Sequence, residues 1–174
     1  MTASTNIILL PDAGPLITLA YADALDVLLL PGWSVQLVDM VLHEVTRNVT
    51  PTSEKLAQWV VDKQLSVLPT KTFAHYQKEK INSLVKTANL GELAIQEVMN
   101  GFALAKPLKN GVFLFEDHKI ARASFLLPDN CRKVSTRAFL LFLEQKDWIT
   151  SSAEIERRAI QAGRAFSQLH FPPE

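Results

Sequence analysis

Four acidic residues are spaced along the chain so that a folded sheet could bring them together. Asp12 and Asp117 each lie just beyond a run of apolar residues, and Glu44 and Glu92 lie on predicted helices between them. Four converging carboxylates would repel one another, so their clustering predicts a bound cation. Carboxylate oxygens suit Mg²⁺ or Mn²⁺, and such a site can activate water and stabilise a phosphoryl leaving oxygen. The order of the acids therefore indicates metal-assisted phosphate chemistry.

Asp12 is the strongest of these signals. Residues 7–10 predict a short buried strand, and a mostly apolar helix-like stretch begins soon after Pro11. In open α/β sheets, ligands bind beyond the carboxyl ends of the strands. Asp12 therefore either faces such a cleft or caps the helix that follows it, and the residue alone does not separate these two roles.

Glu44 and Glu92 each lie on or beside the apolar face of a predicted helix. Asp39 can cap the first of these helices, and 100° per residue then places Glu44 inside the apolar arc, with His43 on the opposite, solvated side. Glu92 lies at the margin of its stripe, and Glu97 lies on the solvated side. Alternatively, Glu44 is a buried acid paired with Arg or Lys, and Glu92 is a first-turn acid stabilised by the helix dipole.

Glu116 and Asp117 follow the apolar run 111–115 together. Strand residues alternate between the two faces of a sheet, so the two acids would point to opposite sides. The sequence therefore leaves open whether Glu116 or Asp117 belongs to the site. Asp117 could also cap the helix that is predicted to begin near Lys119.

Short apolar runs alternate with helix-like stretches along the chain. We predict strands at 6–10, 34–38, 65–68, 111–115 and 132–134, and helices at 16–30, 40–47, 53–63, 118–125, 137–145 and 151–166. A long stretch from 72 to 104 is also helix-like, with Gly91 and Gly101 as possible ends or joints inside it. This alternation predicts an α/β fold with about five mostly parallel strands, covered by helices on both faces.

Length and composition predict one folded domain over residues 1–174, with 150–174 as its C-terminal helical extension. The chain has 174 residues, of which 48% are hydrophobic, and 18 basic residues balance 18 acidic ones. A net charge of zero means that any contact with nucleic acid depends on a local patch. Cys131 is the one cysteine, and charges and prolines interrupt the apolar N-terminal third, which together predict a cytoplasmic protein without a membrane segment.

The four acidic segments resemble the PIN-domain nuclease family, in particular the compact VapC-like toxins and their uncharacterised relatives. The matching segments are 10–16 around Asp12, 38–45 around Glu44, 90–95 around Glu92 and 113–122 around Asp117. Each segment is degenerate, and the resemblance depends mainly on their order. Two differences are that Glu92 stands where many relatives have Asp, and that this chain is longer than the compact toxins.

The resemblance implies a three-layer Rossmann-like PIN fold and a ribonuclease that hydrolyses phosphodiester bonds of RNA with Mg²⁺ or Mn²⁺. Asp12, Glu92 and Asp117 would hold the metal directly, and Glu44 could act through water. Accessory polar residues would be Glu116, Ser135 and Thr136. It further implies an endoribonuclease that is the toxin of a type II toxin-antitoxin pair, with a cognate antitoxin protein and a homodimer as partners.

RNA would be held by cations near the acids. The candidates are Lys119, Arg122 and Arg137, which with Arg132 and Lys133 gather close to the proposed site, and a second basic stretch contains Lys71, Lys78, Lys80 and Lys86. Both groups could instead be ordinary solvated faces. A different class of function also fits the sequence, namely a PIN-like module that binds a protein or RNA without cutting it. Uptake of a divalent metal separates the two functions.

Overall fold

A parallel sheet of five strands forms the centre of the molecule. The computed structural model describes residues 6–81, 89–116 and 127–165. Its strands are β1 (Ile7–Pro11), β2 (Ser34–Val38), β3 (Ser66–Leu68), β4 (Asn110–Phe115) and β5 (Cys131–Ser135). They lie in the order β3-β2-β1-β4-β5, and every neighbouring pair is parallel. The predicted parallel sheet is therefore confirmed.

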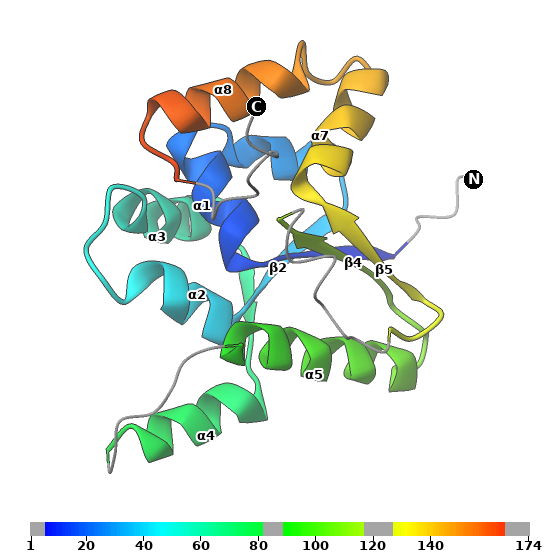
Figure 1. Cartoon of the computed structure of the whole chain (residues 1–174). Coiled ribbons are helices and arrows are strands. Elements are labelled where there is room, and N and C mark those ends of the chain that lie inside the picture. The colour runs from blue at the N-terminus through cyan, green and yellow to red at the C-terminus, as the bar shows by residue number, and fades with distance from the viewer. Residues whose placement is uncertain (1–5, 82–88, 117–126, 166–174) are drawn as a thin grey trace, which may run out of the picture.

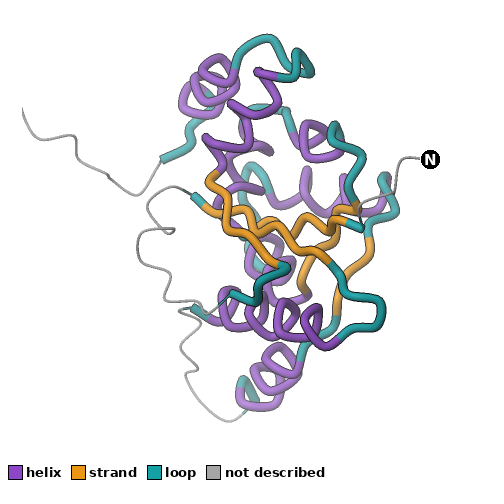
Figure 2. The backbone as a smooth tube through the Cα atoms, turned by 90° about the vertical axis from the view of Figure 1, so that its right-hand side faces the viewer, coloured by secondary structure: helices purple, strands orange, loops and turns teal. Residues whose placement is uncertain are grey.

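Helices cover both faces of this sheet, which gives three layers (Figure 1). The helices are α1 (Ala13–Tyr21), α2 (Asp39–Thr46), α3 (Ser53–Asp62), α4 (Lys71–Glu79), α5 (Leu90–Leu104), α7 (Thr136–Gln145) and α8 (Ser152–Gln161), with a 3-10 helix η1 at Leu25–Leu29. In Figure 1, α1, α7 and α8 lie above the sheet and α5 lies below it, with α4 against α5. Figure 2 shows the strands between the two helical layers from a second direction.

The two central strands are apolar on both faces, because helices cover both sides of a parallel sheet. Leu9 and Leu10 of β1 are fully buried, and so are Phe113 and Leu114 of β4. The apolar residues of β1 and β4 therefore lie in the core of the molecule. Within the described ranges, no helix combines the length and the apolar character needed to cross a membrane.

Two of the predicted helices are divided in the structure. The helix predicted at 16–30 is α1 followed by η1, because Asp23 adopts a left-handed conformation with φ 51° just after α1 ends and so interrupts the α-helix. The long stretch from 72 to 104 contains α4 and α5. Gly91 lies in the first turn of α5, so it marks an end of a helix as predicted. Gly101 lies inside α5 and marks neither an end nor a joint. The helix predicted at 118–125 lies outside the described residues.

Candidate active site at the carboxyl edge of the sheet

The strand order reverses at β1, and two acids lie there. β2 and β3 extend the sheet from one side of β1, and β4 and β5 extend it from the other. Pro11 of β1 pairs with Leu114 of β4, and the amide of Asp12 donates to the Leu114 carbonyl at 2.9 Å. Asp12 and Glu116 therefore leave neighbouring strands at the same edge. Such a reversal point is where open α/β sheets bind their ligands.

Asp12 is buried, with an exposed fraction of 1%. It stands at the N-cap position of α1, but its side chain accepts no capping hydrogen bond from that helix. Capping of α1 is thus not the role of this carboxylate. A carboxylate can be kept in a buried place only where cations or hydrogen-bond donors offset its lost hydration, so the position suits an acid that serves a binding site.

Glu116 is also buried, at 6% exposure, and its carboxylate lies against α1. Thr18 Oγ1 donates to Glu116 Oε1 at 2.6 Å, and Arg164 Nη2 lies 3.9 Å from the same oxygen. Gly14 makes room for this side chain, since a Cβ at position 14 would overlap Glu116 Cγ. The sequence does not reveal Thr18, Arg164 or Gly14 as partners of this edge. A buried threonine within an apolar helix is the one signal that points to such a partner.

A second pair of acids lies at the start of α5. Glu44 of α2 is half-buried, and its Oε1 accepts a hydrogen bond from the amide of Gly91 at 3.1 Å. The N-cap residue Asn89 has φ 66° and gives α5 no side-chain cap. Glu44 therefore satisfies an unpaired amide of α5 from another helix. Glu92 follows in the first turn of α5, where both its proposed metal role and its stabilisation by the helix dipole are possible.

The prediction that Glu44 points inward is confirmed, and the amide of Gly91 is one partner of its carboxylate. Gly91 is required for this contact, since an added Cβ there would lie 2.9 Å from Glu44 Oε2. Glu44 and Glu92 are thus brought to one helix terminus, as Asp12 and Glu116 are brought to one strand edge. Among residues 6–81, 89–116 and 127–165, however, no three acids, histidines or cysteines are grouped closely enough to hold a metal ion.

The remaining predicted site residues have mixed outcomes. Asp117 lies outside the described residues, so a metal site that includes it stays a prediction. Ser135 caps α7, because its Oγ accepts from the amide of Ala138 at 3.0 Å. Thr136 is buried and donates to the carbonyl of Phe115 at 3.1 Å. The Thr136 hydroxyl therefore links the start of α7 to the carboxyl end of β4 next to Glu116, whereas the Ser135 hydroxyl serves α7.

The predicted RNA contacts lie only partly within the described chain. Lys119 and Arg122 fall outside it. Arg137 pairs with Glu156 of α8, with Nε 3.2 Å from Oε1. Arg132 donates to the carbonyl of Asp129 at 2.8 Å. Contact of these cations with RNA stays a prediction.

The structure corrects the predicted position of His43, which does not project into solvent. Its ring packs against Phe73 and Tyr76 of α4, with centroid distances of 5.3 and 5.4 Å. Its Nε2 is buried without a hydrogen-bond partner in the described part of the chain. Burial lowers the pKa of His43, and the nearby charges of Lys80 and Arg47 lower it further. Helix periodicity identifies the face toward the sheet but does not predict that α4 covers the opposite face.

A lowered His43 pKa makes stability depend on pH. The unfolded chain binds a proton on His43 below about pH 6.5, whereas the folded chain binds it only at a lower pH. The neutral, buried His43 therefore contributes to the free energy of unfolding above pH 6.5, and this contribution is lost as the pH falls toward the pKa of the folded state. We expect His43→Phe to lose less stability than the wild type between pH 7.5 and pH 5.5 in urea unfolding. His75→Gln, at an exposed position of α4, is the control, and an unchanged pH dependence in His43→Phe would contradict the assignment.

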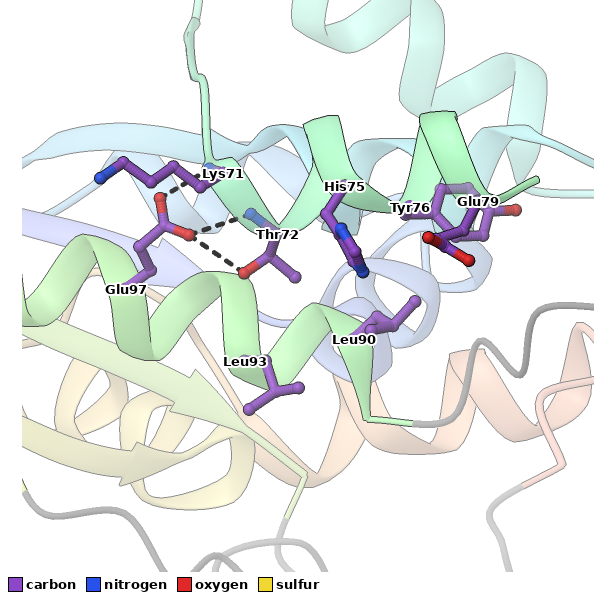
Figure 3. Close-up of a pocket in the computed structure, with 8 residues that line it drawn as sticks. All are labelled: Lys71, Thr72, His75, Tyr76, Glu79, Leu90, Leu93 and Glu97. Carbon is purple, nitrogen blue, oxygen red and sulfur yellow. Dashed lines mark hydrogen bonds between the residues drawn. The ribbon is translucent and has the colours of Figure 1, made fainter. Parts of the chain in front are cut away.

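A groove of about 550 Å³ lies between α4 and α5 (Figure 3). At one end, Glu97 reaches from α5 to the start of α4, where it accepts from the amides of Lys71 and Thr72 at 2.7 and 3.0 Å. Burial alone would raise the pKa of the Glu97 carboxyl. The hydrogen bonds from the two amides and from the Thr72 hydroxyl outweigh this effect of burial, so the pKa of Glu97 is lowered. The prediction that Glu97 is merely solvated is wrong, because α4 covers that face of α5.

The parallel sheet and its reversal point indicate where a ligand would bind, but one such fold serves many chemistries. Function must therefore be argued from the acids and their surroundings. Comparisons with protein-family models, with curated proteins and with solved structures find no match to this chain.

Proposed function

We propose that the chain is a metal-dependent ribonuclease whose site lies at the carboxyl edge of β1 and β4. The observation that carries the proposal is the burial of Asp12 at the reversal point of the strand order, in a position where its side chain does not cap α1. Buried acids at such an edge suit Mg²⁺ or Mn²⁺. The toxin role, the antitoxin and the homodimer stay predictions from the resemblance to PIN-domain nucleases.

In this proposal Asp12, Glu92 and Asp117 would hold the metal, and Glu44 would complete the set through water. A metal of this type supplies an activated water and charge stabilisation for the leaving oxygen. The chain itself contributes orientation. Gly91 fixes Glu44 through its amide, and Thr136 ties β5 to the end of β4. Since no group of three possible metal ligands occurs among the residues that the structure describes, the proposal requires Asp117 to complete the set.

The first test is Asp12→Asn, which keeps the size of the side chain and removes its charge. We expect RNA cleavage in Mn²⁺ to fall roughly a hundredfold or more, and the thermal unfolding curve to stay cooperative. Cleavage by the wild type should stop with a chelator. The control is Asp62→Asn on α3, whose carboxylate is exposed and accepts from Gln58.

Two outcomes would contradict the proposal. Undiminished cleavage by Asp12→Asn would show that the reaction takes place elsewhere or comes from a contaminant. No uptake of Mn²⁺ by the wild type, measured by calorimetric titration, would exclude a metal-dependent enzyme.

A further inference from the structure

The groove between α4 and α5 has the size of a small-molecule site and an apolar floor. Its volume is about 550 Å³, and sites for small ligands span roughly 300–1,000 Å³. Leu90 and Leu93 of α5 line it together with the ring of Tyr76 from α4 (Figure 3). Tyr76 is buried, whereas Leu93 is 54% exposed. The groove therefore holds apolar surface that a bound ligand would remove from water.

An acid lies at each end of this groove. Glu97 lies at the start of α4, where its carboxylate accepts from the amides of Lys71 and Thr72. Glu79 is the last residue of α4 and lies at the other end, and His75 points into the groove between the two acids (Figure 3). A helix rises 1.5 Å per residue, so Glu79 lies about 10 Å farther along α4 than Thr72.

Both acids carry charge that a ligand can use. The hydrogen bonds from α4 lower the pKa of Glu97 despite its burial, so this carboxyl is ionised at neutral pH. Glu79 is exposed and makes no ion pair or hydrogen bond with the residues of the described ranges. Lys71 is the one lysine among the described residues that line the groove, and its side chain extends away from His75 (Figure 3). The groove thus has negative charge at both ends and an apolar middle.

We propose that the groove binds a linear diamine or polyamine, with one terminal ammonium group at Glu97, the other at Glu79, and the methylene chain on Leu90 and Leu93. A carboxylate has about four acceptor positions. The start of α4 occupies three of those on Glu97, which leaves one for an ammonium donor. The groove lies apart from the carboxyl edge of the sheet, so this binding does not depend on the proposed metal.

The test compares amines of different length by calorimetric titration in about 0.15 M salt, where charges more than roughly 8 Å apart are screened. We expect diaminooctane to bind roughly tenfold more tightly than diaminobutane, because the shorter chain cannot reach both acids and covers less apolar surface. Octylamine lacks one ammonium group and should bind about twofold to fivefold more weakly than diaminooctane. Spermidine, whose terminal amines are separated by the same number of atoms, should compete with diaminooctane.

Two exposed positions allow the groove to be tested without a loss of folding. Glu79→Gln should weaken the binding of diaminooctane by about twofold to fivefold, whereas Glu54→Gln, at an exposed acid of α3, should have no effect. Leu93→Ala should weaken binding roughly fivefold, because apolar contact is lost. Its control is Leu141→Ala, since Leu141 is a 44% exposed leucine of α7. All four variants should unfold cooperatively on heating.

Several results would overturn this assignment. Equal affinity for diaminooctane and diaminobutane would mean that the protein attracts cations without using the groove. Equal losses in each variant and its control would place the diamine elsewhere. A wild-type dimer that Leu93→Ala dissociates in sedimentation experiments would assign the groove to a second copy of the chain. Absence of diamine binding would also overturn it but would leave the proposed ribonuclease intact, because Asp12→Asn tests that function separately.

Discussion

Replacing Gly14 with alanine should lower the free energy of unfolding by about 2–3 kcal/mol and weaken the candidate site. Gly14 lies in the first turn of α1, and a Cβ there would overlap Glu116 Cγ. That atom is close to the backbone of a buried residue, so it cannot move aside as a surface side chain can. The Glu116 carboxylate would have to leave Thr18, and we expect RNA cleavage to fall with it.

The matched control is Gly101→Ala. Gly101 lies inside α5, and nothing lies within 4 Å of an added Cβ there. Alanine in a helix interior is favoured over glycine by about 0.5–1 kcal/mol, so this variant should be more stable than the wild type in urea. In Gly14→Ala, the further change Glu116→Ala should remove the overlap, and the two substitutions should cost less together than their sum. Equal stability of Gly14→Ala and the wild type would contradict the packing described for Glu116.

Replacing Asp39 with alanine should cost about 3 kcal/mol, because three hydrogen bonds end on this one carboxylate. Asp39 begins α2, and its side chain accepts from the amide of Met40 at 2.7 Å. It also accepts from the amide and the hydroxyl of Thr70, at 2.8 and 2.7 Å. Thr70 in turn caps α4, with its Oγ1 accepting from the amide of Phe73 at 3.1 Å. Asp39 therefore joins the ends of β2 and β3 to the start of α4.

The measurement is urea unfolding at pH 7 with Asp62→Ala as the control. Asp62 is an exposed carboxylate of α3, and its removal should change the unfolding free energy by less than about 0.5 kcal/mol. A double-mutant cycle with Thr70→Val tests the contact itself, since coupled residues give non-additive effects. Additive losses in Asp39→Ala and Thr70→Val would exclude the proposed link between the two side chains.

Local patterns in the sequence predict the sheet and part of the site. The apolar run before Asp12 predicts β1, because a central parallel strand is buried on both faces and so lacks alternation. The apolar arc of α2 also places Glu44 correctly on an inward side. In both cases the information lies within a few neighbouring residues.

Contacts between distant segments could not be predicted in the same way. Thr18 is separated by 98 residues from Glu116 and by 146 from Arg164, and no local periodicity relates such positions. Helix periodicity predicts solvent-facing positions for His43 and Glu97, because it identifies only one buried face of a helix. α4 packs on the other face of both α2 and α5, and only the tertiary arrangement reveals this second contact.

The strand order has a consequence for synthesis of the protein. β1 lies between β2 and β4, but β4 leaves the ribosome long after β2 because domains are made from the N-terminus. Until then one edge of the fully apolar segment around Leu9 and Leu10 has no partner strand. Such an edge readily pairs with other chains. Slow elongation between β2 and β4 should therefore favour aggregation of the nascent protein, and chaperones that shield the first strand should raise its yield.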